Sequence, residues 1–105
     1  MGFFNNIFGA GGSNENLATI VNEGAFLVDV RSSGEFADGN VKGSVNIPLD
    51  QVQNQLAKFK DKENIVVFCR SGNRSSQAKS ILEQNGFTNV TNGGTWQDVN
   101  AVISK

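Results

Sequence analysis

Hydrophobic residues along the chain fall into short clusters whose spacing alternates between that of a strand and that of a helix. Apolar runs predict four strands, which cover residues 26–30, 44–47, 65–68 and 88–91. Apolar residues three and four positions apart predict helices around these strands, over residues 16–23, 32–36, 49–59, 74–86 and 95–103. Strands that alternate with helices predict an α/β domain, with a mainly parallel sheet of four or five strands and helices on both faces.

The chain of 105 residues is long enough for one compact domain and too short for two. We expect a flexible N-terminal arm over residues 1–13 and a single domain over residues 14–105. No apolar run approaches the ~20 residues that span a bilayer. The arm contains no lysine or arginine, so it lacks the positive region of a secretory signal. These features predict a cytoplasmic protein without a membrane span, and we expect it to be a monomer.

Composition narrows the chemistry that this chain can perform. Nine basic and ten acidic residues give a net charge of −1, so the clustered basic excess of a nucleic-acid-binding protein is not expected. The chain has no histidine and one cysteine, which excludes serine–histidine triads, internal disulfides and most metal sites. We therefore expect neither a metal nor a cofactor. Any chemistry must come from one thiol, carboxylates, arginines and backbone amides.

The single cysteine, Cys69, stands directly after the predicted strand 65–68, where open α/β sheets bind their ligands. The residues that follow it are Arg70, Ser71, Gly72, Asn73 and Arg74. A loop that curls into a helix can point backbone N–H groups and the positive end of the helix dipole at the sulfur, and two arginines add charge. Such surroundings lower the pKa of a cysteine. We therefore expect a sulfur that is ionised and open to solvent.

Two other interpretations concern the cysteine and the acidic and basic residues near it. A lone cysteine can be a small buried hydrophobic residue, although burial fits poorly with the polar residues that follow Cys69. Asp29 and Arg31 stand at the end of the predicted strand 26–30, and Glu35 follows Ser32 at the spacing of a capping box. We expect these three residues to have structural roles. In this hypothesis Asp29 accepts hydrogen bonds from the loop amides, and Arg31 pairs with Glu35.

The segment from Cys69 to Arg74, with Ser75 after it, resembles the active-site loop of single-domain rhodaneses, the thiosulfate sulfurtransferases. The resemblance extends over residues 17–103. It includes Asp29-Val30-Arg31, Glu35-Phe36, residues 43–48 (Gly-Ser-Val-Asn-Ile-Pro), and Gly93-Gly94 followed by Trp96. One difference is that Gly39-Asn40 stands where the family often has Gly-His, at a position that is not catalytic in the family. The order of several motifs makes the resemblance specific.

This resemblance implies a sulfur transfer in two steps. Cys69 is the nucleophile that takes the outer sulfur of thiosulfate or a related donor, and its persulfide passes that sulfur to cyanide, a thiol or a sulfur-accepting protein. The backbone amides of residues 70–74 would stabilise the charged sulfur. Gly72 would let the loop curl, Arg70 would attract the anionic donor, and Arg74 would fix the charge at the start of the helix.

Other functions remain open at this point. A cysteine-based phosphatase or arsenate reductase has five residues between cysteine and arginine, whereas four separate Cys69 from Arg74. A thioredoxin-like reductase would need a second cysteine. The sequence does not separate an enzyme from a non-catalytic rhodanese-like module, or from a module that carries sulfur between proteins.

Overall fold

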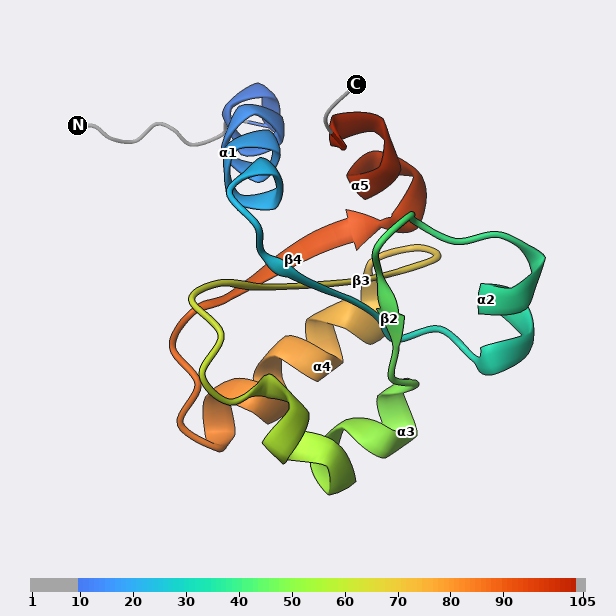
Figure 1. Ribbon diagram of the computed structural model, residues 1–105, viewed down its shortest axis with the longest axis vertical. Helices are drawn as coiled ribbons and strands as arrows, with labels where there is room; N and C mark the ends of the chain where they lie inside the picture. The colour runs from blue at the N-terminus through green and yellow to red at the C-terminus, as the bar shows by residue number, and fades with distance from the viewer. Residues whose placement is uncertain (1–9, 104–105) are drawn as a thin grey trace.

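The structure, a computed structural model, describes residues 10–103 (Figure 1). Helices and strands alternate along the chain, as the sequence predicts. In order they are α1 (Ala10–Asn22), β1 (Phe26–Asp29), α2 (Ser33–Asp38), β2 (Val45–Asn46), α3 (Leu49–Val52), the 3₁₀ helix η2 (Gln53–Phe59), β3 (Ile65–Cys69), α4 (Asn73–Gln84), β4 (Val90–Thr95) and α5 (Trp96–Val102). No helix in this range is long and apolar enough to cross a bilayer.

The four strands form one parallel sheet in the order β2-β1-β3-β4, which confirms the predicted fold class. Helices α1 and α5 cover one face, while α3, η2 and α4 cover the other (Figure 1). β1 and β3 are neighbours, with Asp29 paired with Phe68. The segments that follow these two strands therefore leave the same edge of the sheet. This arrangement places the start of α2 near the start of α4.

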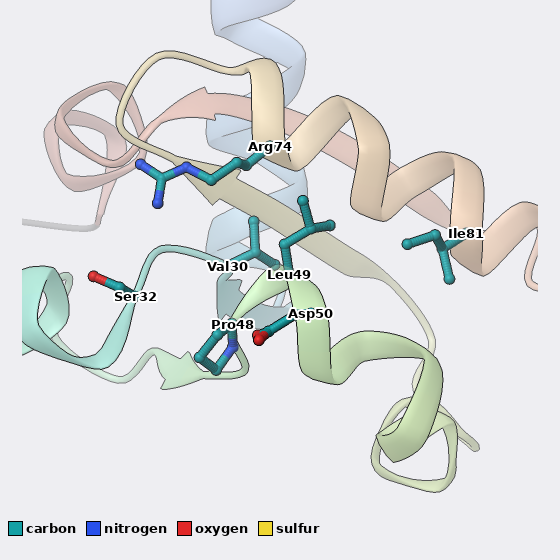
Figure 2. Close-up of a pocket in the computed structure, with 7 residues that line it drawn as sticks. All are labelled: Val30, Ser32, Pro48, Leu49, Asp50, Arg74 and Ile81. Carbon is teal, nitrogen blue, oxygen red and sulfur yellow. The ribbon is translucent and has the colours of Figure 1, made fainter.

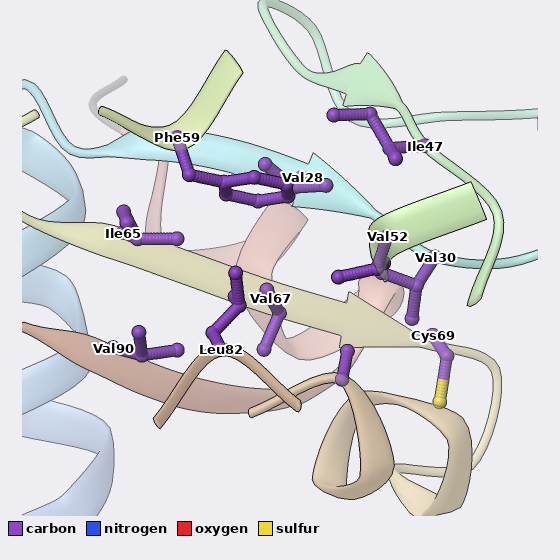
Figure 3. Close-up of a cluster of buried hydrophobic side chains, with 11 residues drawn as sticks. Val28, Val30, Ile47, Val52, Phe59, Ile65, Val67, Cys69, Leu82 and Val90 are labelled. Atoms are coloured by element: carbon purple, nitrogen blue, oxygen red, sulfur yellow. The ribbon is translucent and has the colours of Figure 1, made fainter. Parts of the chain in front are cut away.

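The central strand β3 divides the core into two clusters because its side chains alternate between the faces of the sheet. Val66 and Phe68 belong to the cluster beneath α1 and α5. Ile65, Val67 and Cys69 belong to the cluster on the side of α4 (Figure 3). All five residues of β3 are buried, as expected for a central parallel strand. Cys69 therefore leaves the sheet on the face that carries α4.

Two predicted helices have different boundaries in the structure. The helix predicted over 16–23 begins at Ala10, so residues 10–13, predicted to be part of a flexible arm, are helical. A glycine costs a helix about 1 kcal/mol, but each residue added to an existing helix gains a backbone hydrogen bond. The predicted helix 49–59 is two helices, α3 and η2, with a non-helical Gln55. Its apolar residues are three or four apart, a spacing that α and 3₁₀ helices share. Residues 1–9 of the predicted arm lie outside the described residues.

The last strand is also displaced from its prediction, since β4 covers Val90–Thr95 rather than residues 88–91. Residues 92–94 read Asn-Gly-Gly, a sequence with low strand propensity. Pairing with β3 overrides that preference and is interrupted only by a bulge, where Val67 pairs with Asn92 and Phe68 with Gly94. Gly93 is the extra residue of this bulge.

Candidate active site

The loop between β3 and α4 curls around the sulfur of Cys69 because Gly72 adopts a left-handed conformation. Gly72 has φ 95° and is the N-cap of α4, and its N–H donates to Sγ of Cys69 at 3.0 Å. A Cβ at this position would lie 3.6 Å from Cα of Gly94, an ordinary contact. The glycine is therefore required for its backbone conformation rather than for lack of space.

Ser75, one turn into α4, supplies two more polar contacts to the sulfur. Its N–H donates to Sγ of Cys69 at 3.4 Å, and the thiol donates to its Oγ at 3.5 Å. Burial acts to raise the pKa of Cys69, but the Ser75 side chain and the N–H groups of Ser75, Ser71 and Gly72 outweigh it, so the pKa lies below its ordinary value. The surroundings favour a negative charge on the sulfur. The donors differ in part from the predicted set 70–74, because Ser75 lies outside it.

The expectation that the sulfur is open to solvent is wrong, because Cys69 is 0% exposed. Figure 3 shows its sulfur pointing away from β3 towards the start of α4. The loop that covers it presents backbone N–H groups inward, while the side chains of Arg70, Ser71 and Asn73 are exposed. The polar residues after Cys69 are therefore compatible with a buried sulfur, because their side chains point away from it. The Cys69 side chain is therefore buried in the core, and its sulfur still accepts hydrogen bonds from backbone N–H groups.

Asn92 of β4 holds the Ser75 hydroxyl and the loop together. Oγ of Ser75 lies 2.7 Å from Oδ1 of Asn92, which also accepts from the N–H of Gly94 at 2.9 Å, and Nδ2 of Asn92 is 3.5 Å from O of Gly72. Sequence reasoning assigned no role to Ser75 or Asn92. The available signal was a polar residue on an apolar face, because Ser75 is buried together with Ala78 and Leu82.

Asp29 and Arg31 form a buried pair with each other, which corrects the predicted contacts of both. The Arg31 side chain donates to both carboxylate oxygens of Asp29, the shortest bond being 2.7 Å, and its backbone N–H donates at 2.9 Å. It also donates to O of Gly39 and stacks over Trp96, 4.8 Å from the ring centroid. Residues two apart at the end of a strand share a face. This pair joins β1 to the segment after α2 and to α5.

Glu35 pairs with Arg74 rather than with Arg31, so it connects α2 to the cysteine loop. Arg74 donates to the two carboxylate oxygens at 2.7 and 3.1 Å. Ser32 and Glu35 also form the predicted capping box at the start of α2. Hydrogen bonds from Arg74 and from the backbone of Ser32 lower the pKa of Glu35 from 4.5 to about 2. Arg74 therefore has a partner, whereas the Arg70 side chain makes no hydrogen bond or ion pair among residues 10–103.

A hollow of about 460 Å³ opens beside the loop, between the starts of α2, α3 and α4 (Figure 2). Its walls are largely apolar, with Arg74 as the cation among the lining residues. Those residues are Val30, Ser32, Pro48, Leu49, Asp50, Arg74 and Ile81. Across the described part of the chain, no group of three or more acidic, cysteine or histidine side chains could hold a metal ion. The loop can stabilise a negative charge on the sulfur, and the hollow, which Arg74 connects to the loop, can hold a small molecule.

Comparison with known proteins gives consistent matches. The family described as "Rhodanese-like domain" matches residues 13–95. The chain is 39% identical over 74 residues to thiosulfate sulfurtransferase PspE of Escherichia coli (strain K12), which covers 69% of this chain and 71% of that protein. It is 33% identical over 82 residues to human thiosulfate:glutathione sulfurtransferase, covering 65% and 71%.

A solved structure agrees with these sequence matches. The human single-domain sulfurtransferase TSTD1 aligns with a TM-score of 0.70 and 29% identity, covering 86% of this chain and 94% of that structure. The aligned region therefore includes most of the sheet and its helices. Because the family match spans most of the described chain, and because named sulfurtransferases share its sequence and fold, the chain belongs to the family of rhodanese-like domains.

Proposed function

We propose that this protein moves a sulfane sulfur from thiosulfate, or from a related persulfide donor, to cyanide or a thiol through a persulfide on Cys69. Sulfur transfer is the activity in the names of its relatives. One observation carries the assignment to Cys69: its Sγ accepts N–H groups from Gly72 and Ser75, at 3.0 and 3.4 Å. These donors favour the thiolate, which is the nucleophilic form of cysteine.

In the first step the Cys69 thiolate attacks the outer sulfur of thiosulfate. An Sγ–S bond forms, the S–S bond of the donor breaks, and sulfite leaves with its electron pair. In the second step cyanide or a thiolate attacks the terminal sulfur of the persulfide, and the Cys69 thiolate is restored. The product is thiocyanate or a new persulfide. An ionised thiol needs no general base, so the absence of histidine from the sequence is compatible with this cycle.

The two arginines of the loop have different roles in this proposal. The Arg74 guanidinium donates to both carboxylate oxygens of Glu35, at 2.7 and 3.1 Å, so its positive charge is balanced by an ion pair. Arg70 is exposed and makes no ion pair within the described residues, so it is the cation available to an incoming anion. We assign donor recruitment to Arg70 and loop anchoring to Arg74.

The covered sulfur adds a requirement to the proposal. Because Cys69 is 0% exposed, the donor reaches Sγ only when the short segment from Arg70 to Gly72 moves outward. The outer side of that segment carries the exposed side chains of Arg70 and Ser71. The movement breaks the hydrogen bond from the N–H of Gly72 to the sulfur.

Intact-mass measurement after treatment with thiosulfate tests the covalent step. We expect wild-type protein to gain one sulfur, about 32 Da, and Cys69→Ser to gain none. Steady-state assays with thiosulfate and cyanide should show the same dependence on Cys69. Equal rates for the two proteins would contradict the proposal. A mass gain that neither cyanide nor a small thiol discharges would instead favour a sulfur-accepting protein, and hence the carrier alternative.

Location and assembly stay predictions within this proposal. A cytoplasmic protein should appear in the soluble cytosolic fraction of its cell, and a monomer should sediment at the mass of one chain, 11.2 kDa. Recovery in another compartment, or a concentration-dependent larger species, would contradict them.

A further inference from the structure

The Ser75 hydroxyl has one hydrogen and two oxygen acceptors close to it. Oδ1 of Asn92 lies at 2.7 Å and O of Gly72 at 3.1 Å, while Sγ of Cys69 lies at 3.5 Å. The orientation of the Asn92 amide is fixed by its other neighbours. A backbone N–H can only donate, so the atom that faces the N–H of Gly94 at 2.9 Å is the oxygen. Neither oxygen near the Ser75 hydroxyl can donate to it.

The position of the hydroxyl hydrogen therefore depends on the charge of the sulfur. When Cys69 is a thiol, its S–H points to Oγ of Ser75 and the hydroxyl donates to Asn92, the nearest acceptor. When Cys69 is a thiolate, its sulfur becomes a charged acceptor, and hydrogen bonds to charged groups are about twice as strong as neutral ones. A rotation about the Cβ–Oγ bond then moves the hydrogen from the amide oxygen to the sulfur.

We propose that the Ser75 hydroxyl donates its hydrogen to one of two acceptors, Oδ1 of Asn92 or Sγ of Cys69. Asn92 is a positioning residue, which accepts this hydrogen while Cys69 is neutral and loses it to the sulfur when Cys69 is a thiolate. The inference rests on the proposed role of Cys69. In that cycle the sulfur is charged before it attacks the donor and neutral within the persulfide, so the hydrogen changes acceptor twice in each turnover. Asn92 competes with the thiolate for this hydrogen and so limits how far the thiolate is stabilised.

The alternation of side chains along β4 places Asn92 there, and the β-bulge at Gly93 holds its amide in place. Val90 and Asn92 lie two residues apart on β4, and Val90 packs in the cluster on the α4 side of the sheet. Pairing then skips Gly93 and resumes at Gly94, whose N–H turns back to Oδ1 of Asn92. Bulges often aim a side chain beside a functional site. Here the bulge brings the N–H of Gly94 to the Asn92 amide beside the start of α4.

Titration of the thiolate by its ultraviolet absorbance, with Cys69→Ser as the blank, tests the proposal on the sulfur itself. The chain has no tyrosine, so no other side chain with a nearby pKa absorbs in the same way. We expect Ser75→Ala to raise the titration midpoint by about one pH unit, because the thiolate loses its hydroxyl donor. Asn92→Ala should lower the midpoint by roughly half a pH unit, because the nearer of the two competing acceptors is gone and only O of Gly72 remains.

The double variant decides whether Asn92 acts through Ser75. In the Ser75→Ala background, Asn92→Ala should leave the midpoint where it is. An unchanged midpoint in Ser75→Ala, or an equal effect of Asn92→Ala with and without Ser75, would overturn the proposal. Asn89→Ala is the matched control, because Asn89 also bonds backbone oxygens, those of Lys62 and Glu63 at the opposite end of β3. It should not move the midpoint.

Two further points keep the test decisive. If Asn92→Ala does not fold, Asn92→Asp replaces it, because the carboxylate still accepts the N–H of Gly94. The carboxylate is a stronger acceptor for the Ser75 hydroxyl than the amide is, so Asn92→Asp should raise the midpoint more with Ser75 present than in Ser75→Ala. Equal rises would overturn the proposal. The charged groups on the elements around the loop are Asp29, Arg31, Glu35, Arg70, Arg74 and Asp98. Ser75→Ala and Asn92→Ala leave them unchanged, whereas Asn92→Asp adds one negative charge, so only the difference between its two backgrounds is compared. Midpoint shifts without a 32 Da gain would reject the proposed function alone, and a gain without shifts would reject this inference alone.

Discussion

Gly93 sits where β4 bulges, and a methyl group added there has no room. A Cβ at this position would lie 2.8 Å from Cγ2 of Val99 and 2.9 Å from Cγ1 of Val66. Both valines are 0% exposed, so neither can turn aside into solvent. Carbon atoms in contact prefer a separation of roughly 3.5–4.0 Å. Substitution by alanine must therefore push α5 away from the sheet or force the valines out of their preferred rotamers.

We expect Gly93→Ala to lower the free energy of unfolding by about 1–3 kcal/mol, which is the usual cost of overpacking a core. In a domain of this size, 1 kcal/mol changes Tm by about 4–8 °C, so Tm should fall by roughly 4–24 °C. Thermal unfolding followed by circular dichroism measures the change in Tm, and urea unfolding gives the free energy. In a Val99→Ala background, Gly93→Ala should lower the free energy of unfolding by less, because one of the two methyl groups that clash with the new Cβ is absent.

Gly34 of α2 provides the matched control, because a Cβ there would meet no atom within 4 Å. We expect Gly34→Ala to raise the free energy of unfolding by about 0.5–1 kcal/mol, since alanine loses less backbone freedom than glycine in a helix. The two glycine-to-alanine substitutions should therefore change the free energy of unfolding in opposite directions. If Gly93→Ala is as stable as the wild type, the close packing of α5 on the bulge is refuted.

Two further predictions concern the charges around the loop. The pKa of Glu35, lowered from 4.5 to about 2, means that its ion pair with Arg74 contributes fully above pH 4.5 and is lost as the pH falls towards 2. The Tm difference between wild type and Glu35→Gln should shrink over that range, and a constant difference would contradict the pairing. Arg70→Ala should raise the KM for thiosulfate about fivefold, the effect of roughly 1 kcal/mol from one exposed charge, without lowering Tm. An equal loss with an uncharged persulfide donor would show that Arg70 shapes the loop instead.

The strands and the place of the cysteine could be predicted because they depend on local patterns. The apolar runs that form β1 and β3 are continuous, and Cys69 follows the second of them directly. The capping box of Ser32 and Glu35 needs only residues three positions apart. Such local patterns predict structure well because residues that are close in sequence stay close in the folded chain.

The contacts of the loop could not be predicted because they depend on strand order. Glu35 and Arg74 are 39 positions apart, and they meet because β1 and β3 are adjacent in the sheet. The burial of Cys69 was missed for a different reason. The sequence predicts a loop that points its backbone N–H groups at the sulfur, but it does not show how closely that loop packs over the sulfur.

The cover over the sulfur also bears on oxidative damage. Peroxides convert an accessible thiolate to sulfenic acid, which a second cysteine can trap as a disulfide before irreversible oxidation. Cys69 is the only cysteine in this sequence, so no such rescue exists within the chain. A sulfur enclosed by valines on one side and amides on the other meets dissolved oxidants rarely. The same burial disfavours a disulfide between two copies of the chain, because both sulfurs would have to be uncovered at once.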